Sequence, residues 1–286
     1  MSGQTLHNSN VEKEYMRWLD IIGPADPYYS KFTIGLHEVL QAHFLLIDFF
    51  FDIGEGIGGV GPKNMNLLHS ALSRQFVEFG GKPKWKDRIQ ICASLMYGLI
   101  KNHPFHDANK RTSFLTSILH LQKIGRTPIV SHKEFEDFTV DIAEYNLPSY
   151  SGFDEFVQAG SDAPVLFIAK YLKKSTRQID LRSKQITYNE LNAIISKRNM
   201  YLDHPNGNRI DVMRIDEVPG RDAFHHRIAK IGFHGWSREV CRKDVDIVRE
   251  ASRLDARHGY DSQSFFNGLE DPLSLIVPAS VSNPRL

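Results

Sequence analysis

The sequence has 286 residues, of which 41% are hydrophobic and 24% charged, and its formal net charge is +1 at pH 7. These values are typical of a globular protein, and they exclude an electrostatic argument for nucleic-acid or membrane binding by the whole chain. No apolar run reaches membrane-spanning length, and the first ten residues lack the segments of an export signal. Because the two cysteines, Cys92 and Cys241, lie far apart, we expect free thiols in a cytoplasmic protein.

The first part of the chain shows the periodicity of helices. We predict a polar N-terminal arm over residues 1–30, with a short helix near 12–19, and then a long core helix over 33–52. Five glycines follow within residues 54–61. No strand precedes them, so we interpret this run as a flexible loop and not as a phosphate-binding fingerprint. Another helix is predicted to begin near residue 66.

Two strong helical patterns flank residues 103–112. Apolar residues recur at i, i+3 and i+4 spacings over residues 86–101 and again over 114–125, where a glycine ends the second pattern. The loop therefore joins the end of one buried helix to the start of the next. A helix start offers unpaired N–H groups and a partial positive charge, which suit a phosphate. Lys110 and Arg111 fall in this first turn, where the macrodipole disfavours cations unless an anion lies nearby.

The same loop holds other groups that phosphate chemistry needs. His103 can take a proton from an attacking hydroxyl, because the ordinary pKa of histidine lies near working pH, and Pro104 pushes it away from helical geometry. Asp107 is a hard oxygen ligand suited to Mg²⁺. Asn109 can orient the loop or contact phosphate, while Phe105 is expected to enter the core. Each residue alone fits an ordinary polar connection, but the combination favours a site.

This stretch reads His103-Pro104-Phe105-His106-Asp107-Ala108-Asn109-Lys110-Arg111-Thr112. It closely resembles the Fic/Doc family signature, H-P-F-x-D/E-G-N-G-R-x-x-R, and matches best the Doc (death-on-curing) branch, which reads D-A-N-K-R-T. The resemblance implies a mainly α-helical Fic/Doc domain over residues 31–175. It also implies a catalytic base at His103 and a Mg²⁺ ligand at Asp107. The turn that binds ATP or another nucleoside triphosphate is assigned to Ala108, Asn109, Lys110 and Arg111. Asp107, Lys110 and Arg111 are also counted as catalytic.

The segment near Arg74 is similar to the stretch that precedes the active-site flap in the Doc branch. We therefore add Arg74 to the predicted nucleotide-binding residues, with an ordinary surface arginine as the alternative.

Two positions depart from the nucleotidyl-transferring Fic pattern. Lys110 replaces the glycine that lets the α- and β-phosphates approach the backbone, and Phe114 replaces the second arginine, which grips the γ-phosphate. In the Doc branch this lysine accompanies a reversed nucleotide. The resemblance thus implies phosphoryl transfer to a Ser, Thr or Tyr hydroxyl of a protein substrate, by a toxin-like modifier. The alternatives are AMPylation by the same histidine base and a non-catalytic Fic-fold regulator.

Regulation is predicted from the absence of a known inhibitory motif. Many Fic enzymes are silenced by an S/T-x-x-x-E-G/N helix, which this sequence does not contain. We therefore expect restraint either by an antitoxin-like partner or by the C-terminal domain acting as an intramolecular inhibitor.

Beyond the motif the pattern changes to that of a small α+β module over residues 185–286. The predicted elements are helices over 133–145 and 162–174, a polar linker over 176–184, a helix after a capping box at 187–190, a turn at 204–208, strands over 209–215 and 228–233, and a helix over 236–254 whose regular part begins at residue 243.

The C-terminal module weakly resembles HicA-like, double-stranded-RNA-binding-type folds. Asn208 and Arg209 stand where HicA toxins carry a catalytic histidine, so we do not transfer nuclease activity; RNA interaction through this module stays an alternative. A metal cluster of His225, His226 and His234 is disfavoured, because no carboxylate or cysteine lies at a familiar ligand spacing.

Overall fold

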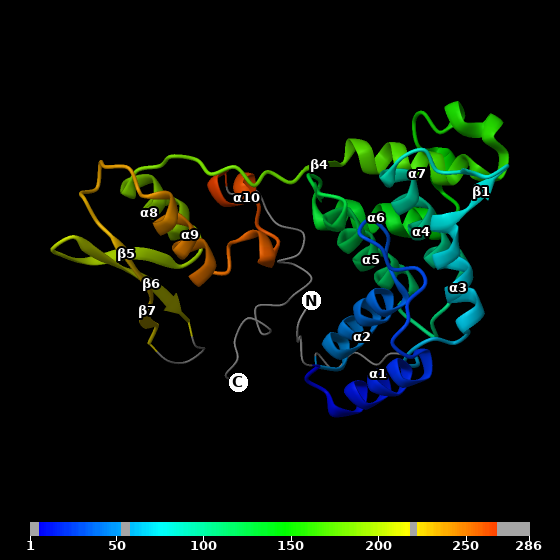
Figure 1. Cartoon of the computed structure of the whole chain (residues 1–286), viewed down its shortest axis with the longest axis horizontal. Helices are drawn as coiled ribbons and strands as arrows, with labels where there is room; N and C mark the ends of the chain where they lie inside the picture. Colours follow the sequence, from blue (N-terminus) through cyan, green and yellow to red (C-terminus); the bar gives the residue numbers. More distant parts are fainter. Residues whose placement is uncertain (1–5, 53–57, 218–221, 268–286) are drawn as a thin grey trace. The chain divides into compact units, whose positions relative to one another are not determined.

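The computed structural model describes residues 6–52, 58–217 and 222–267 (Figure 1). The chain divides into two compact units, Met1–Gln178, which we call unit 1, and Ile179–Leu286, which we call unit 2. The boundary falls within the polar stretch 176–184 that we predicted as a linker. In the glycine run, Gly54 and Gly56 lie outside the described residues.

Unit 1 is mainly helical, as predicted. Its helices are α1 (Ser9–Ile22), α2 (Leu36–Asp52), α3 (Met65–Ser73), α4 (Arg88–Asn102), α5 (Asn109–Lys123), α6 (His132–Ala143) and α7 (Ala163–Lys174), with short 3-10 helices η1 (Arg74–Phe76), η2 (Leu147–Ser149) and η3 (Asp154–Asp162). The expected core helix is α2, which packs between α1 and α5 (Figure 1). Its Leu40, Phe44 and Ile47 are fully buried. No helix in the described part of the chain is long and apolar enough to cross a membrane.

The N-terminal segment is fastened to α2. The carboxylate of Asp48, which is buried, accepts hydrogen bonds from the backbone N–H groups of His7 and Asn8, each at 2.8 Å. The side chain of Asn8 in turn caps α1, and Val11 joins the hydrophobic core. The segment predicted as a polar arm therefore packs on the rest of unit 1, because the buried carboxylate of Asp48 needs hydrogen-bond donors.

Short strands lie at the edges of unit 1. Strands β1 (Glu78–Phe79) and β2 (Lys82–Pro83) form a hairpin whose turn residues Gly80 and Gly81 both have positive φ angles, of 58° and 73°. Strand β4 (Thr176–Gln178) pairs antiparallel with β3 (Arg126–Pro128). The first residues of the predicted linker are therefore a strand, which local polarity did not indicate.

Unit 2 has the element order helix, three strands, helix, followed by a short helix. These elements are α8 (Tyr188–Ser196), β5 (Met200–Asn206), β6 (Arg209–Asp216), β7 (Phe224–Gly232), α9 (Arg242–Ala251), the 3-10 helix η4 (Ala256–His258) and α10 (Ser262–Asn267). The sheet is antiparallel in the order β5-β6-β7. The capping box at Thr187 and Glu190 is confirmed. The helix predicted over 236–254 is wrong for its first six residues, because α9 begins only at Arg242.

One face of this sheet forms the core of unit 2. Leu202, Val212 and Ile231 point to that face and are buried in the cluster that also contains residues of α8 and α9. Both helices therefore cover the same side of the sheet. Both cysteines of the chain are free, as predicted: Cys92 is buried in α4, and Cys241 is exposed at the start of α9.

Candidate active site

The loop between α4 and α5 begins and ends with a residue in the left-handed region. His103 has φ 47° and ψ 59°, and Ala108 has φ 57° and ψ 21°. For residues other than glycine this conformation costs about 1–2 kcal/mol each. Pro104 explains the first turn, because it disfavours helical geometry in the residue before it. Two strained residues within one six-residue loop are a pattern associated with functional sites.

The loop is held from within by Phe105 and Asn109. The side chain of Phe105 is buried in the hydrophobic core, as predicted. The Asn109 side chain accepts the Phe105 backbone N–H at 2.9 Å and donates to the Phe105 carbonyl at 3.0 Å. Both ends of the amide group are therefore used by the loop itself. Of the two roles considered for Asn109, this geometry matches the one of orienting the loop.

Asp107 presents an exposed, ionised carboxylate. Its Oδ2 accepts the backbone N–H of Gly58 at 3.0 Å, and its Oδ1 accepts that of Ala108. These two hydrogen bonds, with smaller help from the charge of Arg111, lower the pKa of Asp107 below its ordinary value. An exposed carboxylate with a lowered pKa is suited to hold a divalent cation through its remaining lone pairs.

The start of α5 is open to an anion. Its N-cap, Ala108, provides no side-chain cap, so N–H groups of the first turn have no side-chain acceptor among the described residues. Lys110 lies in this turn with its Nζ 3.3 Å from Glu144 Oε1, and the Arg111 guanidinium lies 4.1 Å from the centre of the Phe50 ring. Both predicted phosphate-binding cations thus lie at the helix start. Lys110 contacts Glu144, at the C-terminal end of α6, and Arg111 contacts Phe50 of α2.

Two other positions bear on the predicted nucleotide binding. Among the described residues, the contacts of Arg74 are with α4 and Trp85: its guanidinium lies 5.3 Å from the Tyr97 ring, and its carbonyl accepts the Trp85 indole N–H. Its part in nucleotide binding stays a prediction. Phe114 is buried against His132 and Phe135 of α6. The position of the family's second arginine is therefore occupied by a core side chain.

Residues outside the motif complete the site and were not predicted. His43 of α2 lies directly beneath the loop with its ring stacked on Phe105 at 3.8 Å, and Gly58 supplies the N–H group on Asp107. A single histidine on the apolar face of a helix indicates core packing at the level of sequence. No spacing in the sequence signals that it touches the motif.

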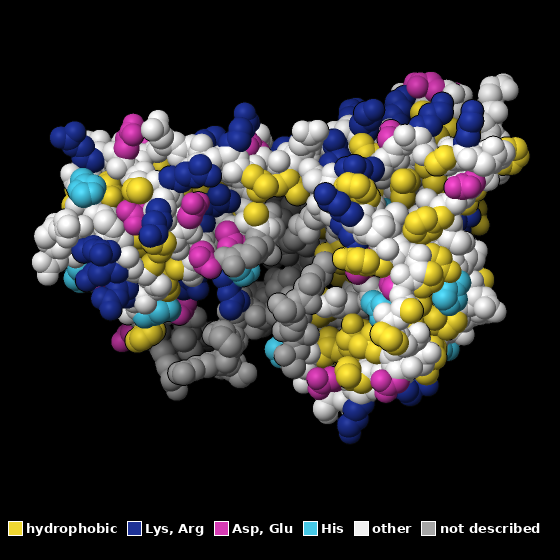
Figure 2. Space-filling model, in the orientation of Figure 1, with side chains coloured by type: hydrophobic (Ala, Val, Ile, Leu, Met, Phe, Trp, Pro, Cys, Tyr) yellow, Lys and Arg dark blue, Asp and Glu magenta, His cyan; other side chains and the backbone are white. Residues whose placement is uncertain are grey.

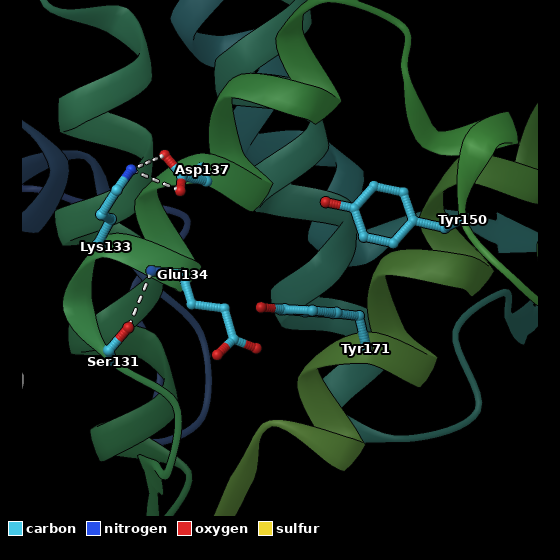
Figure 3. A pocket seen from close by; sticks show the side chains of 6 residues that line it. All are labelled: Ser131, Lys133, Glu134, Asp137, Tyr150 and Tyr171. Carbon is cyan, nitrogen blue, oxygen red and sulfur yellow. Dashed lines mark hydrogen bonds and ion pairs between the residues drawn. The ribbon is translucent and has the colours of Figure 1, made fainter.

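A pocket of about 310 Å³ lies elsewhere on unit 1 (Figure 3). It is lined by Ser131, Lys133, Glu134, Asp137, Tyr150 and Tyr171, and none of these belongs to the loop. Lys133 is paired with Asp137 at 2.8 Å, and the Tyr150 hydroxyl donates to Asp141. The loop site is instead an exposed surface at a helix start. Within the described residues no group of three or more His, Cys, Asp or Glu side chains could hold a metal ion.

The arrangement as a whole defines a class of protein: a helical domain that offers an exposed histidine and an ionised carboxylate beside an uncapped, cationic helix start. Comparison with known families agrees with this class. Residues 32–121 match the model of the Fic/DOC family, and the match contains the whole loop together with His43 and Gly58. Over residues 32–121, unit 1 is therefore similar to the Fic/DOC family. Neither the curated proteins nor the solved structures compared with the chain give a match.

Proposed function

We propose that unit 1 catalyses Mg²⁺-dependent transfer of a phosphoryl group from a nucleoside triphosphate to a hydroxyl of a protein. The observation that carries the proposal is the loop itself, which brings His103, Asp107 and the open start of α5 together. The match to the Fic/DOC family is consistent with nucleotide-dependent protein modification in general. ATP is the nucleotide that we favour.

The residues of the loop have different roles in the proposed reaction. His103, which is exposed, accepts the proton of a Ser, Thr or Tyr hydroxyl as its oxygen forms a bond to the γ-phosphorus. The bond from the γ-phosphorus to the bridging oxygen breaks, and the nucleoside diphosphate leaves. The α5 start, with Lys110 and Arg111, binds phosphate oxygens through N–H groups and positive charge.

Asp107 is the residue that would hold Mg²⁺. Its carboxylate is exposed and ionised, and Mg²⁺ typically takes one or two protein carboxylates and fills its remaining positions with water and phosphate oxygens. The donor set therefore fits the ion. When bound, Mg²⁺ supplies positive charge that offsets the charge on the transferring phosphate.

Two side chains support phosphoryl over adenylyl transfer. Phe114 is buried, so the usual nucleotide pose lacks its γ-phosphate anchor. Lys110 carries a side chain where the relatives that transfer an adenylyl group need glycine. We therefore expect a protein target incubated with ATP and Mg²⁺ to gain about 80 Da, the mass of a phosphoryl group, and not about 329 Da. Intact mass spectrometry of candidate targets measures this. A gain of the adenylyl mass would show that AMPylation is the reaction.

Lys110→Gly tests the lysine directly. Removing the ammonium group removes a positive charge from the proposed phosphate-binding site at the start of α5. Phosphoryl transfer is therefore expected to fall at least tenfold, while metal binding persists. The rate of transfer of label from γ-labelled ATP measures this. Glu144→Gln is the matched control, because it releases Lys110 from its pairing without removing it, and it should leave transfer nearly unchanged. Unchanged transfer in Lys110→Gly would contradict the assignment.

The RNA-binding alternative finds less support in unit 2. Lys and Arg side chains are spread over the visible face of this unit and are interspersed with acidic ones (Figure 2). Two exposed cations on β7, Arg227 and Lys230, are both paired with Asp211 of β6. A surface that binds phosphate backbones presents unpaired positive charge. RNA binding with a steep salt dependence would favour the alternative.

We further propose that activity is restrained by an antitoxin-like partner or by unit 2. The second option can be tested on the chain itself. A chain that ends at Gln178 keeps β4 and its pairing with β3, and it is expected to transfer faster than the whole chain if unit 2 is the inhibitor. Transfer rates of the two forms, measured at equal concentration, decide the matter. Equal rates would leave the separate partner as the source of restraint.

A further inference from the structure

His43 is a buried histidine with every polar atom engaged. Its side chain is fully buried in unit 1, yet it belongs to α2 and not to the signature. Nδ1 lies 2.9 Å from Thr112 Oγ1, and Nε2 accepts the backbone N–H of Gly61 at 3.3 Å. The ring face stacks on Phe105 with 3.8 Å between centres. One side chain thus contacts three segments that are distant in sequence.

The hydrogen bonds fix the protonation of this ring. A backbone N–H can only donate, so Nε2 must be unprotonated to accept from Gly61. The ring proton then lies on Nδ1 and is donated to Thr112 Oγ1. Burial agrees with a neutral ring, because it lowers the pKa of His43 to about 3. The ring of His43 is therefore uncharged, with Nδ1 as a hydrogen-bond donor and Nε2 as an acceptor.

The segment that His43 binds is paired with the signature loop. The Gly61 carbonyl accepts the His106 N–H at 3.3 Å, and the Pro104 carbonyl accepts the N–H groups of Lys63 and Asn64. Gly61 has φ 82°, in the left-handed region, and a Cβ at this position would collide with the Trp18 ring. This stretch, residues 58–64, therefore takes a specific path.

The same stretch reaches the carboxylate proposed to hold the metal. Three residues before Gly61, the Gly58 N–H donates to Asp107 Oδ2 at 3.0 Å. His43 thus holds residues 58–64 through Gly61, the loop through Phe105, and the first turn of α5 through Thr112.

We propose that His43 is a positioning residue of the transfer site, which fixes Asp107 and the start of α5 relative to each other. The inference rests on the proposed function and adds a residue to it. His43 touches no reacting atom. It acts through Phe105, Gly61 and Thr112, in the way that residues behind a metal ligand orient that ligand. Displacements of about 1 Å in such a site lower rates by about a hundredfold.

The first variant is His43→Phe, which keeps an aromatic ring for Phe105 and removes both hydrogen bonds. We expect a 10- to 100-fold loss in kcat for transfer, an unchanged KM for the protein target, and weaker binding of ATP in the presence of Mg²⁺ by calorimetry. The Gly58 amide resonance should move upfield in ¹H–¹⁵N spectra, because its hydrogen bond to Asp107 loosens. His43→Gln supplies an acceptor for the Gly61 N–H and should recover part of each loss. It also carries the comparison should His43→Phe fail to fold.

His120→Phe is the matched control. His120 is also fully buried in unit 1, and its pKa is lowered by burial to about 4, but its Nε2 bonds the Phe32 carbonyl away from the loop. A merely structural role of His43 predicts that the two variants lose stability and activity in parallel. Parallel losses, or an unmoved Gly58 resonance in folded His43→Phe, would overturn the proposal. If the wild-type chain neither binds ATP with Mg²⁺ nor modifies a protein, the proposed function fails, while the Gly58 resonance still decides the role of His43.

Discussion

Replacing His103 with alanine is expected to reduce protein modification by a factor of about 10² to 10⁴, the usual contribution of a positioned general base. The side chain is exposed at the end of α4, so its removal leaves no buried cavity and no unpaired buried group. The fold should therefore survive. Transfer of label from ATP to a protein target measures the activity, and circular dichroism measures the fold.

Two further variants separate chemistry from backbone geometry. His103 stands at φ 47°, a conformation that asparagine tolerates better than alanine, so His103→Asn removes the base with less backbone strain. It should be as inactive as His103→Ala. His106→Ala changes the other exposed histidine of the loop and is expected to keep activity within a few fold. Full activity in His103→Asn, or loss of activity only in His106→Ala, would show that the base is misassigned.

Local chemistry decided how well helix ends could be predicted. The helix predicted over residues 86–101 is α4, and its end at Asn102 follows from Pro104, two residues further on. The capping box at Thr187 likewise placed the start of α8. Each of these signals acts within four residues, so the sequence alone carries it. The whole of β5 was missed by contrast. Its Pro205 indicated a turn, but Pro is tolerated here because β5 is an edge strand with an irregular register.

The same distinction between local signals and long-range contacts applies to the candidate site. Residues 103–111 could be found from sequence because their chemistry is concentrated in one short stretch. Contacts between distant segments leave no such pattern: His43 and Thr112 are 69 residues apart, and Gly58 and Asp107 are 49 apart. Asn109 shows the intermediate case: its residue type allowed two roles, and the structure shows the hydrogen bonds that orient the loop, while contact with phosphate stays a prediction.

The buried histidines also make unit 1 sensitive to mild acid. Burial lowers the pKa of His43 to about 3 and of His120 to about 4, from an ordinary value of 6.5. Between the folded and unfolded pKa values the unfolded chain binds more protons, so acid favours unfolding. The stability is complete above pH 6.5 and declines as the pH falls below it. Lowered carboxylate pKa values, such as that of Asp107, act at lower pH, so the histidines dominate the decline down to pH 4.5.

We therefore expect the free energy of unfolding of unit 1 to fall by about 5 kcal/mol between pH 7.5 and pH 4.5. Each pH unit is worth about 1.4 kcal/mol per site, which gives about 2–3 kcal/mol for each histidine. This is a large fraction of the stability of a typical domain. Urea unfolding of the chain that ends at Gln178, at constant ionic strength and followed by fluorescence of its tryptophans Trp18 and Trp85, measures it. His120→Phe removes one of the two groups and should roughly halve the pH dependence, whatever its effect at pH 7.5. A free energy that stays level from pH 7.5 to 4.5 would show that these rings accept protons in the folded protein.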